Sequence, residues 1–275
     1  MHESVAYNGK ILKARDAFLP AVSQAAFYGR GVFTTLTIYN YQPFLLTDHL
    51  ERLRSHAAKI NFDLTGIFGV EESLFELIEA NKIESGRARI TYFDVNGGAL
   101  WDFSSERKTS VLITTAERKK TKNDLILNAS PFPINSASPL AGVKSCNYLE
   151  NLLALETAKT DGCSEAVRFN ERGETVSACL ANLFWTKNER IFTPALETGA
   201  LAGTTRNLIF DLAKKLNLQI SEISTGINAL EAADEVFLTS AGIEICPARK
   251  FNESIYQNNN FTPKLQKAFF DFINQ

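Results

Sequence analysis

One lysine separates two unlike segments of the chain. Lys144 lies in the stretch GVKSCNYLENLL (142–153), after the turn-forming approach SPLAG and directly before an apolar run with helical spacing. A lysine amine that is desolvated and deprotonated is a nucleophile, and it condenses with carbonyl compounds. The common alternative is a solvated surface charge, so the rest of the chain has to decide between the two interpretations.

Two short polar segments have the residue types of an anion-binding site. Gly203, Thr204 and Thr205 precede a predicted helix, whose first N–H groups and positive dipole end attract phosphate. Glycine lets a ligand approach the backbone closely, and the two hydroxyls add hydrogen-bond donors. Ser240 ends an apolar strand and offers another hydroxyl. A helix cap and an ordinary turn are the alternative interpretations.

Arg52 lies in the predicted helix DHLERLRSHAAKI, where a solvated helix face is its simplest explanation. A reactive lysine combined with a phosphate site is what pyridoxal 5′-phosphate (PLP) requires, because the amine bonds the cofactor and the protein anchors its phosphate. The residues alone therefore raise PLP as a hypothesis without selecting a reaction.

The first part of the chain mixes strands and helices. Residues 30–46 predict two strands around a turn at Asn40, and a helix capped by Thr47 or Asp48 follows. A second helix is predicted at 71–82, with strands at 87–95 and 109–117. The charged segment 118–124 (RKKTKND) has no apolar pattern, which is typical of a linker.

The second part repeats this mixture in another order. A helix of about 14 residues begins at Asn147 and can end at Gly162. The remaining predicted elements are a hairpin at 165–186, a strand at 190–194, a helix from 205, strands within 234–250 and a terminal amphipathic stretch. Because strands and helices do not alternate strictly, we expect two α+β domains, 1–117 and 125–275, joined by the linker.

Composition narrows the class of partner and cofactor. The chain has 275 residues, is 45% hydrophobic and carries a net charge of −2 with both signs dispersed, which argues against nucleic acid and anionic membranes. No apolar run reaches membrane-spanning length, and no signal peptide is predicted. Three scattered histidines and four scattered cysteines predict no metal site, and reduced thiols favour the cytoplasm.

Five collinear motifs carry a family resemblance. They are FYGRGVFTTL…LLTDHLERL, GVKSCNYLENLLA, LANLFW, LAGTTRNLI and ADEVFLTSAGIEICPAR, spread over residues 25–250. Together they resemble the class IV aminotransferase family, the fold-type IV PLP enzymes, which include branched-chain and D-amino-acid aminotransferases and 4-amino-4-deoxychorismate lyases. The resemblance implies two α/β domains with the cofactor at their interface, a small amino substrate and a homodimer.

The resemblance also implies roles for individual residues. Lys144 matches the lysine that forms the Schiff base with the cofactor, and Tyr148 matches a tyrosine that in some members approaches the cofactor's phenolic oxygen. The positions that match phosphate ligands are Arg52, Thr204, Thr205 and Ser240.

One position departs from the family pattern. The family carries a glutamate five residues before the asparagine of N-[LIV]-F, and this glutamate bonds the pyridine nitrogen; here that position is Ser177. Glu174 lies in the preceding turn with an odd offset, so we do not expect it to substitute. A hydroxyl stabilises a protonated ring nitrogen far less than a carboxylate does, and the ring is then a weaker electron sink.

This departure favours elimination over transamination. We therefore expect a lyase that removes pyruvate from 4-amino-4-deoxychorismate and releases 4-aminobenzoate for folate synthesis. The motifs GVFTT and LANLFW also look more like those of the lyases. A branched-chain or D-amino-acid transaminase is the main alternative, and a relative that binds PLP without catalysis is a weaker one.

Substrate carboxylates need a cation, and two arginines are candidates. Arg89 occupies about the place of the arginine in the Y-I-R-P strand of branched-chain enzymes, and Arg30 replaces a commonly acidic residue. For each arginine, the alternative to binding a substrate carboxylate is an ion pair with an Asp or Glu on the protein surface. Tyr92 and Trp101 are candidates for a pocket wall, although an aromatic residue in a strand is more often part of the core.

Overall fold

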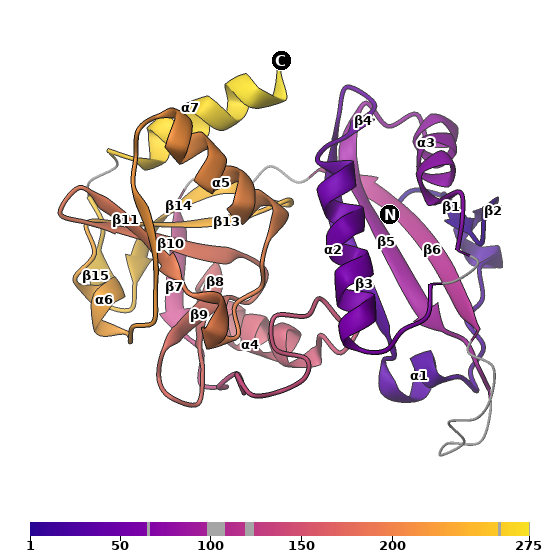
Figure 1. The fold of residues 1–275 in the computed structure, drawn as a ribbon, viewed down its shortest axis with the longest axis horizontal. Helices are drawn as coiled ribbons and strands as arrows, with labels where there is room; N and C mark the ends of the chain where they lie inside the picture. The colour runs from indigo at the N-terminus through magenta and orange to yellow at the C-terminus, as the bar shows by residue number, and fades with distance from the viewer. Residues whose placement is uncertain (65–66, 98–107, 119–123, 258–259, 275) are drawn as a thin grey trace. The chain divides into compact units, whose positions relative to one another are not determined.

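The chain forms two compact units, and each is described by itself (Figure 1). The structure is a computed structural model that describes residues 1–64, 67–97, 108–118, 124–257 and 260–274. Unit 1 consists of residues 1–119 and 143–148, and unit 2 consists of residues 120–142 and 149–275. Trp101 and most of the predicted linker 118–124 lie outside the described residues.

Unit 1 is built on an antiparallel sheet with the strand order β2-β1-β6-β5-β3-β4. Its long central strand β3 is rich in β-branched and aromatic residues, which suit a pleated surface. Asn40 and Tyr41, both with positive φ, make the turn into the next strand. The strands are β1 (Ser4–Tyr7), β2 (Lys10–Lys13), β3 (Gly31–Tyr39), β4 (Gln42–Pro43), β5 (Ser85–Asp94) and β6 (Thr109–Glu117).

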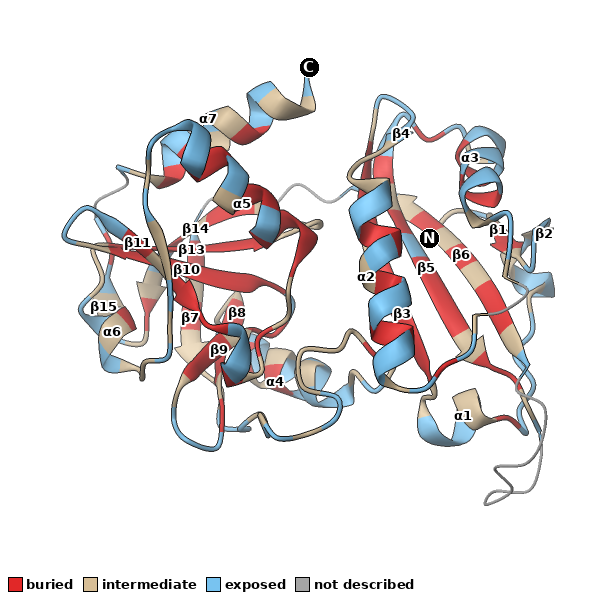
Figure 2. Cartoon of the chain, in the orientation of Figure 1, coloured by how far each residue is buried: buried red, intermediate tan, exposed pale blue. Residues whose placement is uncertain are grey.

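Two helices share one core with this sheet. Four leucines of α2 (Leu46–Lys59) and α3 (Val70–Ala80) belong to the same buried cluster as three residues of β5. The leucines are Leu50, Leu53, Leu74 and Leu77, and the β5 residues are Ala88, Ile90 and Tyr92. Figure 2 shows buried and exposed residues alternating around α2, as expected for a helix with one face on a sheet. The unit also contains η1 (Ala14–Asp16) and α1 (Gln24–Tyr28).

The segment around Lys144 belongs to unit 1 because it extends the sheet beside β3. Ser145 forms an antiparallel bridge with Val32, and the N–H of Cys146 donates to the C=O of Gly31 at 2.9 Å. The sequence analysis assigns this segment to the second domain. The structure groups it with the first, since backbone hydrogen bonds to β3 hold it there.

Unit 2 is built on a larger mixed sheet with the order β12-β11-β10-β13-β14-β7-β8-β9, and β15 pairs with β14. The pairs β11/β12, β14/β7 and β7/β8 are parallel, and the others are antiparallel. The strands are β7 (Leu125–Ala129), β8 (Glu165–Phe169), β9 (Thr175–Ala178), β10 (Asn182–Lys187), β11 (Arg190–Pro194), β12 (Ile220–Ile223), β13 (Glu235–Ser240), β14 (Glu244–Phe251) and β15 (Ser254–Ile255).

Helices cover this sheet. The helices α5 (Thr204–Lys215) and α7 (Thr262–Ile273) pack against each other and against β13 and β14, and α4 (Leu149–Thr160) packs on β8. Shorter helices are η2 (Leu196–Thr198) and α6 (Asn228–Glu231). The mixed α+β class expected from the sequence is confirmed by this architecture.

Two local predictions are wrong. The helix α2 begins at Leu46 after Leu45, whose φ is 53°, so Thr47 and Asp48 lie inside its first turn instead of capping it. Asp48 still acts favourably there, because a carboxylate near a helix N-terminus interacts well with the dipole. Residues 175–186 do not form one strand: they form β9 and β10 with a break at 179–181.

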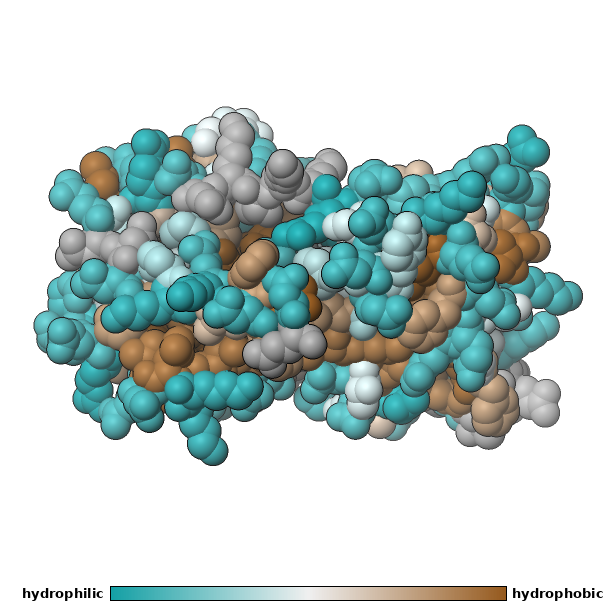
Figure 3. All heavy atoms as spheres, turned by 90° about the horizontal axis from the view of Figure 1, so that it is seen from above, coloured by the Kyte–Doolittle hydropathy of each residue, from teal (hydrophilic) through white to brown (hydrophobic). Residues whose placement is uncertain are grey.

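On the face seen in Figure 3, hydrophilic residues predominate, and hydrophobic residues gather in patches between them. Exposed large apolar side chains include Phe18 and Phe27 in unit 1, and Leu149, Leu152 and Leu153 of α4 in unit 2. Among the described residues, no helix combines the length and the apolar character needed to cross a membrane.

Candidate functional site

Lys144 is fixed by backbone contacts on two sides. Its C=O accepts a hydrogen bond from the N–H of Phe33 in β3 at 3.0 Å. Its N–H donates to Nδ1 of His56 in α2 at 3.1 Å. Strand β3 and helix α2 therefore fix the place from which the lysine side chain extends.

The amine of Lys144 lies among aromatic rings and a hydroxyl. Nζ donates to the Tyr148 hydroxyl at 3.4 Å and lies 4.5 Å from the ring centroid of Phe33 and 4.8 Å from that of Tyr148. The two rings meet edge to face, with centroids 5.3 Å apart. This packing limits the movement of the amine and partly desolvates it.

Burial and two neighbouring arginines lower the basicity of this amine. Burial is the main cause that lowers the pKa of Lys144 to about 7, and the charges of Arg52 and Arg89 lower it further. An amine with this pKa is in large part neutral at neutral pH and keeps its lone pair for attack on a carbonyl carbon. The position and the charge surroundings both fit a nucleophilic lysine better than a solvated surface charge.

Arg52 is held in place by a short hydrogen-bond chain. Its Nη2 donates to Oγ1 of Thr34 in β3 at 2.8 Å, and Oγ1 lies 2.7 Å from Nδ1 of His49. Burial lowers the pKa of His49 to about 3, with smaller contributions from Arg52 and Lys144, so this imidazole is neutral. Because Oγ1 of Thr34 accepts from Arg52, we assign its own O–H as the donor to Nδ1 of His49. Nε of Arg52 is buried and has no hydrogen-bond partner among the described residues.

Arg89 is the second cation beside Lys144. Its guanidinium lies 3.6 Å from the ring centroid of Phe33, and its Nε donates to Oγ1 of Thr91 at 3.1 Å. Burial lowers the pKa of Arg89, while its interaction with Cys146 acts in the opposite direction. The structure thus brings Arg89, a predicted carboxylate ligand, into the same cluster as Lys144 and Tyr148.

The other two predicted substrate residues lie elsewhere. Arg30 pairs with the buried Asp94 at 3.2 Å and donates to the C=O of Asn61 at 3.3 Å, so its charge is already matched. Tyr92 is 4% exposed and belongs to the core of unit 1. It lies on the opposite face of β5 from Arg89, because the side chains of successive strand residues point to opposite faces of the sheet.

The residues predicted to bind phosphate from unit 2 surround the start of α5. Gly203 precedes this helix, and a Cβ added there would clash with Oδ1 of Asn182, so a larger residue would have to displace that side chain. Nδ2 of Asn182 donates to the C=O of Leu201 at 2.7 Å and ties strand β10 to the turn. Thr204 and Thr205 are the first helical residues, and the first ladder bond runs from the N–H of Asn207 to the C=O of Gly203.

The fourth predicted ligand of this group, Ser240, ends the neighbouring strand. Asn182 pairs with Thr239 in the β10–β13 ladder, and Ser240 follows directly. Oγ1 of Thr239 is buried and has no hydrogen-bond partner among the described residues. A helix start, a glycine and neighbouring hydroxyls form the kind of surface that binds a phosphate group.

Ser177 lies opposite a buried arginine in unit 2. The β8–β9 ladder pairs it with Arg168, which is fully buried. The guanidinium of Arg168 donates to the C=O of Phe132 at 3.1 Å and to Oδ1 of Asn151 at 2.6 Å. The carboxylate of Glu174 is bound by Arg172 at 2.7 Å and by Asn170 at 2.7 Å, as expected for a residue confined to the turn.

Sequence reasoning missed the two histidines of α2 and the β3 residues Phe33 and Thr34. His49 and His56 are seven residues apart with Arg52 between them, and both are buried. Polar residues recurring at this spacing on the apolar face of an amphipathic helix are a signal that something polar lies against that face. From their number and scatter alone, the histidines predict only the absence of a metal site.

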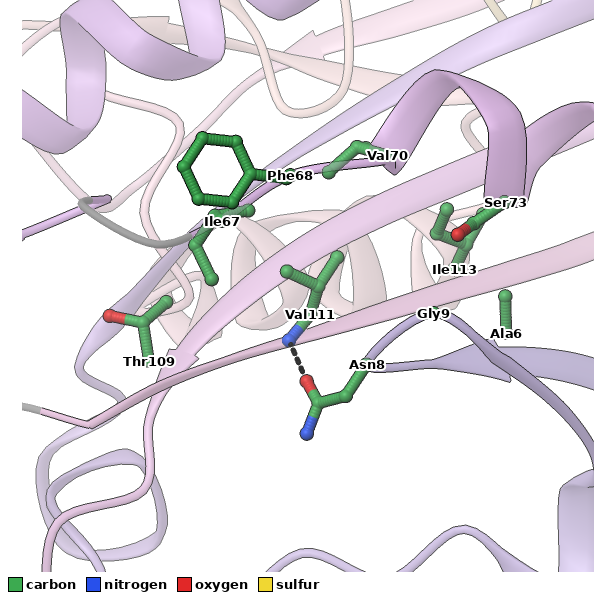
Figure 4. Close-up of a pocket in the computed structure, with 10 residues that line it drawn as sticks. All are labelled: Ala6, Asn8, Gly9, Ile67, Phe68, Val70, Ser73, Thr109, Val111 and Ile113. Atoms are coloured by element: carbon green, nitrogen blue, oxygen red, sulfur yellow. Dashed lines mark hydrogen bonds between the residues drawn. The ribbon is translucent and has the colours of Figure 1, made fainter.

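A small pocket in unit 1 has a different character (Figure 4). It holds about 210 Å³, and its lining contains no titratable side chain. Figure 4 shows Asn8 beside it, accepting a hydrogen bond from the N–H of Val111 at 2.8 Å. We do not consider it the reaction site, because acid–base chemistry needs a titratable group. Among the described residues, no group of three or more His, Cys, Asp or Glu side chains is arranged to hold a metal ion.

The described residues fit a small anionic carbonyl compound. In unit 1, the amine of Lys144, which is in large part neutral at pH 7, lies beside Arg52 and Arg89. The Nε–H group of Arg52 is buried and has no hydrogen-bond partner among the described residues. In unit 2, the start of α5 provides a phosphate-binding surface of its own. PLP is an aldehyde with a phosphate group, so its chemistry matches both sets of donors.

Comparison with known proteins points the same way. The family profile described as amino-transferase class IV matches residues 31–251. Aminodeoxychorismate lyase of Bacillus subtilis is 31% identical over 269 residues, covering 95% of this chain and 92% of its own length. Branched-chain-amino-acid aminotransferase of Escherichia coli is 27% identical, covering 96% of this chain and 91% of its own length.

Solved structures share the fold over nearly the whole chain. The branched-chain amino acid aminotransferase of Escherichia coli superposes with a TM-score of 0.89 at 26% identity, covering 98% of this chain and 94% of that one. A 4-amino-4-deoxychorismate lyase from Pseudomonas aeruginosa superposes with a TM-score of 0.88 at 22% identity, covering 98% of this chain and 100% of that one.

Proposed function

Because this chain belongs to the class IV aminotransferase family, a family of enzymes, we propose that it binds PLP and eliminates pyruvate from 4-amino-4-deoxychorismate to give 4-aminobenzoate. The observation that supports a lyase most directly is Ser177, which stands opposite the buried Arg168 where the family has a carboxylate. The 31% identity to the Bacillus subtilis lyase supports the same reaction.

In this proposal, the predicted ligands each contribute donors to the cofactor's phosphate. Arg52 offers the N–H group that has no partner among the described residues, and Thr204, Thr205 and Ser240 offer hydroxyl groups, the two threonines also at the start of α5. Tyr148 orients the amine of Lys144 through its hydroxyl. Bound PLP supplies an electrophilic aldehyde and a ring that accepts electron density from the substrate carbon.

Lys144 moves the proton. As a neutral amine, Nζ takes the proton from the amino-bearing ring carbon of the substrate. The neighbouring C–O bond to the enolpyruvyl group then breaks, and the electron pair of the lost C–H bond becomes the double bond that makes the ring aromatic. The ammonium of Lys144 returns the proton to the methylene carbon of the leaving enolpyruvate, which becomes pyruvate, so no oxidant or water is consumed.

Charge near the ring nitrogen decides how strongly the ring withdraws electrons. The hydroxyl of Ser177 is neutral, and the guanidinium of Arg168 is a fixed positive charge on the neighbouring strand. If the ring nitrogen of bound PLP faced Ser177, both groups would disfavour its protonated form relative to a carboxylate. Elimination tolerates this weaker electron sink, since formation of an aromatic product supplies driving force. Arg89, beside Lys144, is our candidate for binding a substrate carboxylate.

A branched-chain transaminase is the competing function, and the 27% identity to the Escherichia coli aminotransferase favours it. Product analysis separates the two. We expect 4-aminobenzoate and pyruvate in equal amounts from 4-amino-4-deoxychorismate, without consumption of a keto acid. A stoichiometric exchange between a branched-chain amino acid and 2-oxoglutarate, with no 4-aminobenzoate, would contradict the lyase.

Cofactor attachment is tested separately by trapping with borohydride. We expect reduction of the PLP-loaded protein to fix the cofactor on the peptide that contains Lys144, and Lys144→Ala to prevent this. Lys267→Ala, at an exposed position of α7, is the matched control and is expected to behave like the wild type. Unchanged covalent labelling of Lys144→Ala would show that another residue holds the cofactor.

We also propose a cytoplasmic homodimer. Four free cysteines are compatible with a reducing compartment. Leu149, Leu152 and Leu153 expose an apolar face on α4, which suits a contact with a second copy. Light scattering during size-exclusion chromatography is expected to give twice the chain mass of 30.5 kDa, and a mass of one chain at all concentrations would exclude the dimer.

A further inference from the structure

The peptide of Lys144 is held from both sides by groups of unit 1. Its C=O accepts the N–H of Phe33 at 3.0 Å, and its N–H donates to Nδ1 of His56 at 3.1 Å. The two following residues continue the contact with β3 through Ser145 and Cys146. His56 is thus the contact from helix α2, whereas the others come from the strand.

His56 has the burial expected of a structural hydrogen-bond acceptor. It is 3% exposed and lies four residues after Arg52 on the same face of α2. The path from the helix to the lysine therefore contains one imidazole ring and one hydrogen bond. Arg52, one turn earlier, reaches Thr34 on β3, so this helix face contacts the strand as well as the peptide of Lys144.

The charge state of His56 suits this contact. Burial lowers the pKa of His56 to about 4, and the cations Arg52, Lys59 and Lys144 lower it further. The ring is therefore neutral near pH 7 and keeps the lone pair on Nδ1 that the N–H of Lys144 needs. A protonated ring would present an N–H group to another N–H group.

We propose that His56 is a positioning residue for Lys144, because its Nδ1 fixes the peptide from which the reacting amine extends. Lys144 has four rotatable side-chain bonds, and packing on Phe33 and Tyr148 guides the amine only if the backbone starts from the right place. The inference rests on the proposed function, in which Lys144 is the reacting amine.

Replacing the ring by isosteric amides gives a sharp test. The Oδ1 atom of asparagine occupies about the position of Nδ1, whereas the Oε1 atom of glutamine extends to about the position of Nε2. His56→Asn should therefore keep the hydrogen bond, and His56→Gln and His56→Leu should lose it. His2→Asn, at a histidine bound to Glu117 in another part of unit 1, is the control.

Amide hydrogen exchange measures the hydrogen bond itself, without any cofactor. In the full chain, we expect exchange at the Lys144 amide to be about tenfold faster in His56→Gln and His56→Leu than in the wild type, with His56→Asn near the wild type. Exchange of the Lys144 amide at the wild-type rate in all three variants would overturn the proposal, since the imidazole would then not hold this peptide.

Turnover of the PLP-loaded enzyme measures the consequence. We expect kcat to fall by about 10- to 100-fold in His56→Gln and His56→Leu with KM nearly unchanged, and His56→Asn to restore most of it. If His56→Leu fails to fold, the comparison of His56→Asn with His56→Gln carries the test alone. A fall in kcat that is the same for asparagine and glutamine would overturn the positioning role. Failure of the proposed function is seen separately, as activity that survives Lys144→Ala.

Discussion

The two units differ in how their cations are paired: Arg168 and Arg206 of unit 2 are buried, whereas in unit 1 Lys144 and Arg52 are half-buried and Arg89 is exposed. In unit 2, the buried Arg206 pairs with Glu222, and the buried Arg168 lies 3.6 Å from Glu150. In unit 1, the described ion pairs join other cations to carboxylates, such as Lys13 to Glu3 and Arg30 to Asp94. None of those described pairs includes Lys144, Arg52 or Arg89, and the charges of the two arginines add to the effect of burial in lowering the pKa of Lys144.

The difference separates structure from function. Desolvating a charge is costly, and a carboxylate partner offsets part of this cost within the protein. A group of cations without such a partner in the described residues gains stability when an anion binds beside it. The buried arginines of unit 2 therefore hold elements together, and the proposed function gives the cations of unit 1 a ligand as their partner.

The largest expected effect tests this contrast through stability. In the protein without cofactor, Arg206→Met should lower the free energy of unfolding by about 2 kcal/mol, because the buried guanidinium loses its hydrogen bonds to the half-exposed Glu222 and to the C=O of Pro194. Arg52→Met should leave the free energy unchanged or raise it slightly, since it removes a desolvated charge without a carboxylate partner. Urea denaturation measures both. A loss at Arg52 as large as that at Arg206 would remove the distinction between the units.

The next effect concerns cofactor affinity. Arg52→Gln should weaken PLP binding by about 10- to 100-fold, the usual value of a hydrogen bond to a charged group. Arg54→Gln is the matched control, because Arg54 lies two residues away on the exposed face of α2. Fluorescence titration with PLP measures the dissociation constants. Equal weakening in the two variants would mean that general positive charge, and not this site, attracts the phosphate.

A smaller effect is expected in the pH dependence of cofactor capture. Only the neutral amine of Lys144 reacts, so the rate of capture should rise with pH and reach half its maximum near pH 7. Arg89→Gln should move this midpoint up by about one unit, since removal of a nearby positive charge favours the ammonium form. Stopped-flow absorbance at a series of pH values measures the midpoint, and a midpoint that does not respond to Arg89 would contradict the electrostatic coupling.

The pKa of Lys144 also makes the free energy of unfolding depend on pH. Its pKa falls from 10.5 to about 7 on folding, so the unfolded chain binds more protons between these two values. The contribution of Lys144 to the free energy of unfolding therefore increases as the pH rises through this window.

The smallest effect is expected at Ser177. Ser177→Glu places a carboxylate opposite Arg168 and should raise the ratio of transamination to elimination several-fold, while Ser177→Ala should leave this ratio almost unchanged. Product ratios from a mixture of 4-amino-4-deoxychorismate, an amino acid and a keto acid measure it. If the glutamate variant kept the wild-type ratio, Ser177 would not explain the choice of reaction.

Much of the fold is predictable from local patterns. The β-branched run of β3, the turn at Asn40 and the amphipathic spacing of α2 and α3 all specify their elements directly. The break at 179–181 is not predictable in the same way, because residues 175–186 remain continuously strand-like. A contact from β8 selects the break: Glu165 accepts the N–H of Leu180 at 3.0 Å.

Candidate site residues can be proposed from the sequence where chemistry depends on residue type and order, as for Lys144 and the turn before α5, and their roles stay predictions. The support for these residues was not predictable, since it comes from distant parts of the chain. His56 is 88 residues from the peptide that it binds, and the contact of Phe33 with the same peptide also crosses a long separation. Arg30 and Tyr92 show the limit of the method, because a pairing with Asp94 and burial in the core depend on tertiary packing.

The assignment of residues 143–148 to unit 1 also affects how the protein is made. The chain leaves this unit after residue 119, returns for six residues and leaves again, so translation of the first 119 residues does not yet produce a finished edge beside β3. During synthesis, the sheet of unit 1 is completed only after residues 143–148 have left the ribosome, because these residues pair with β3. A gene fragment that stops at the predicted linker would therefore encode a unit with an open edge and no reactive amine.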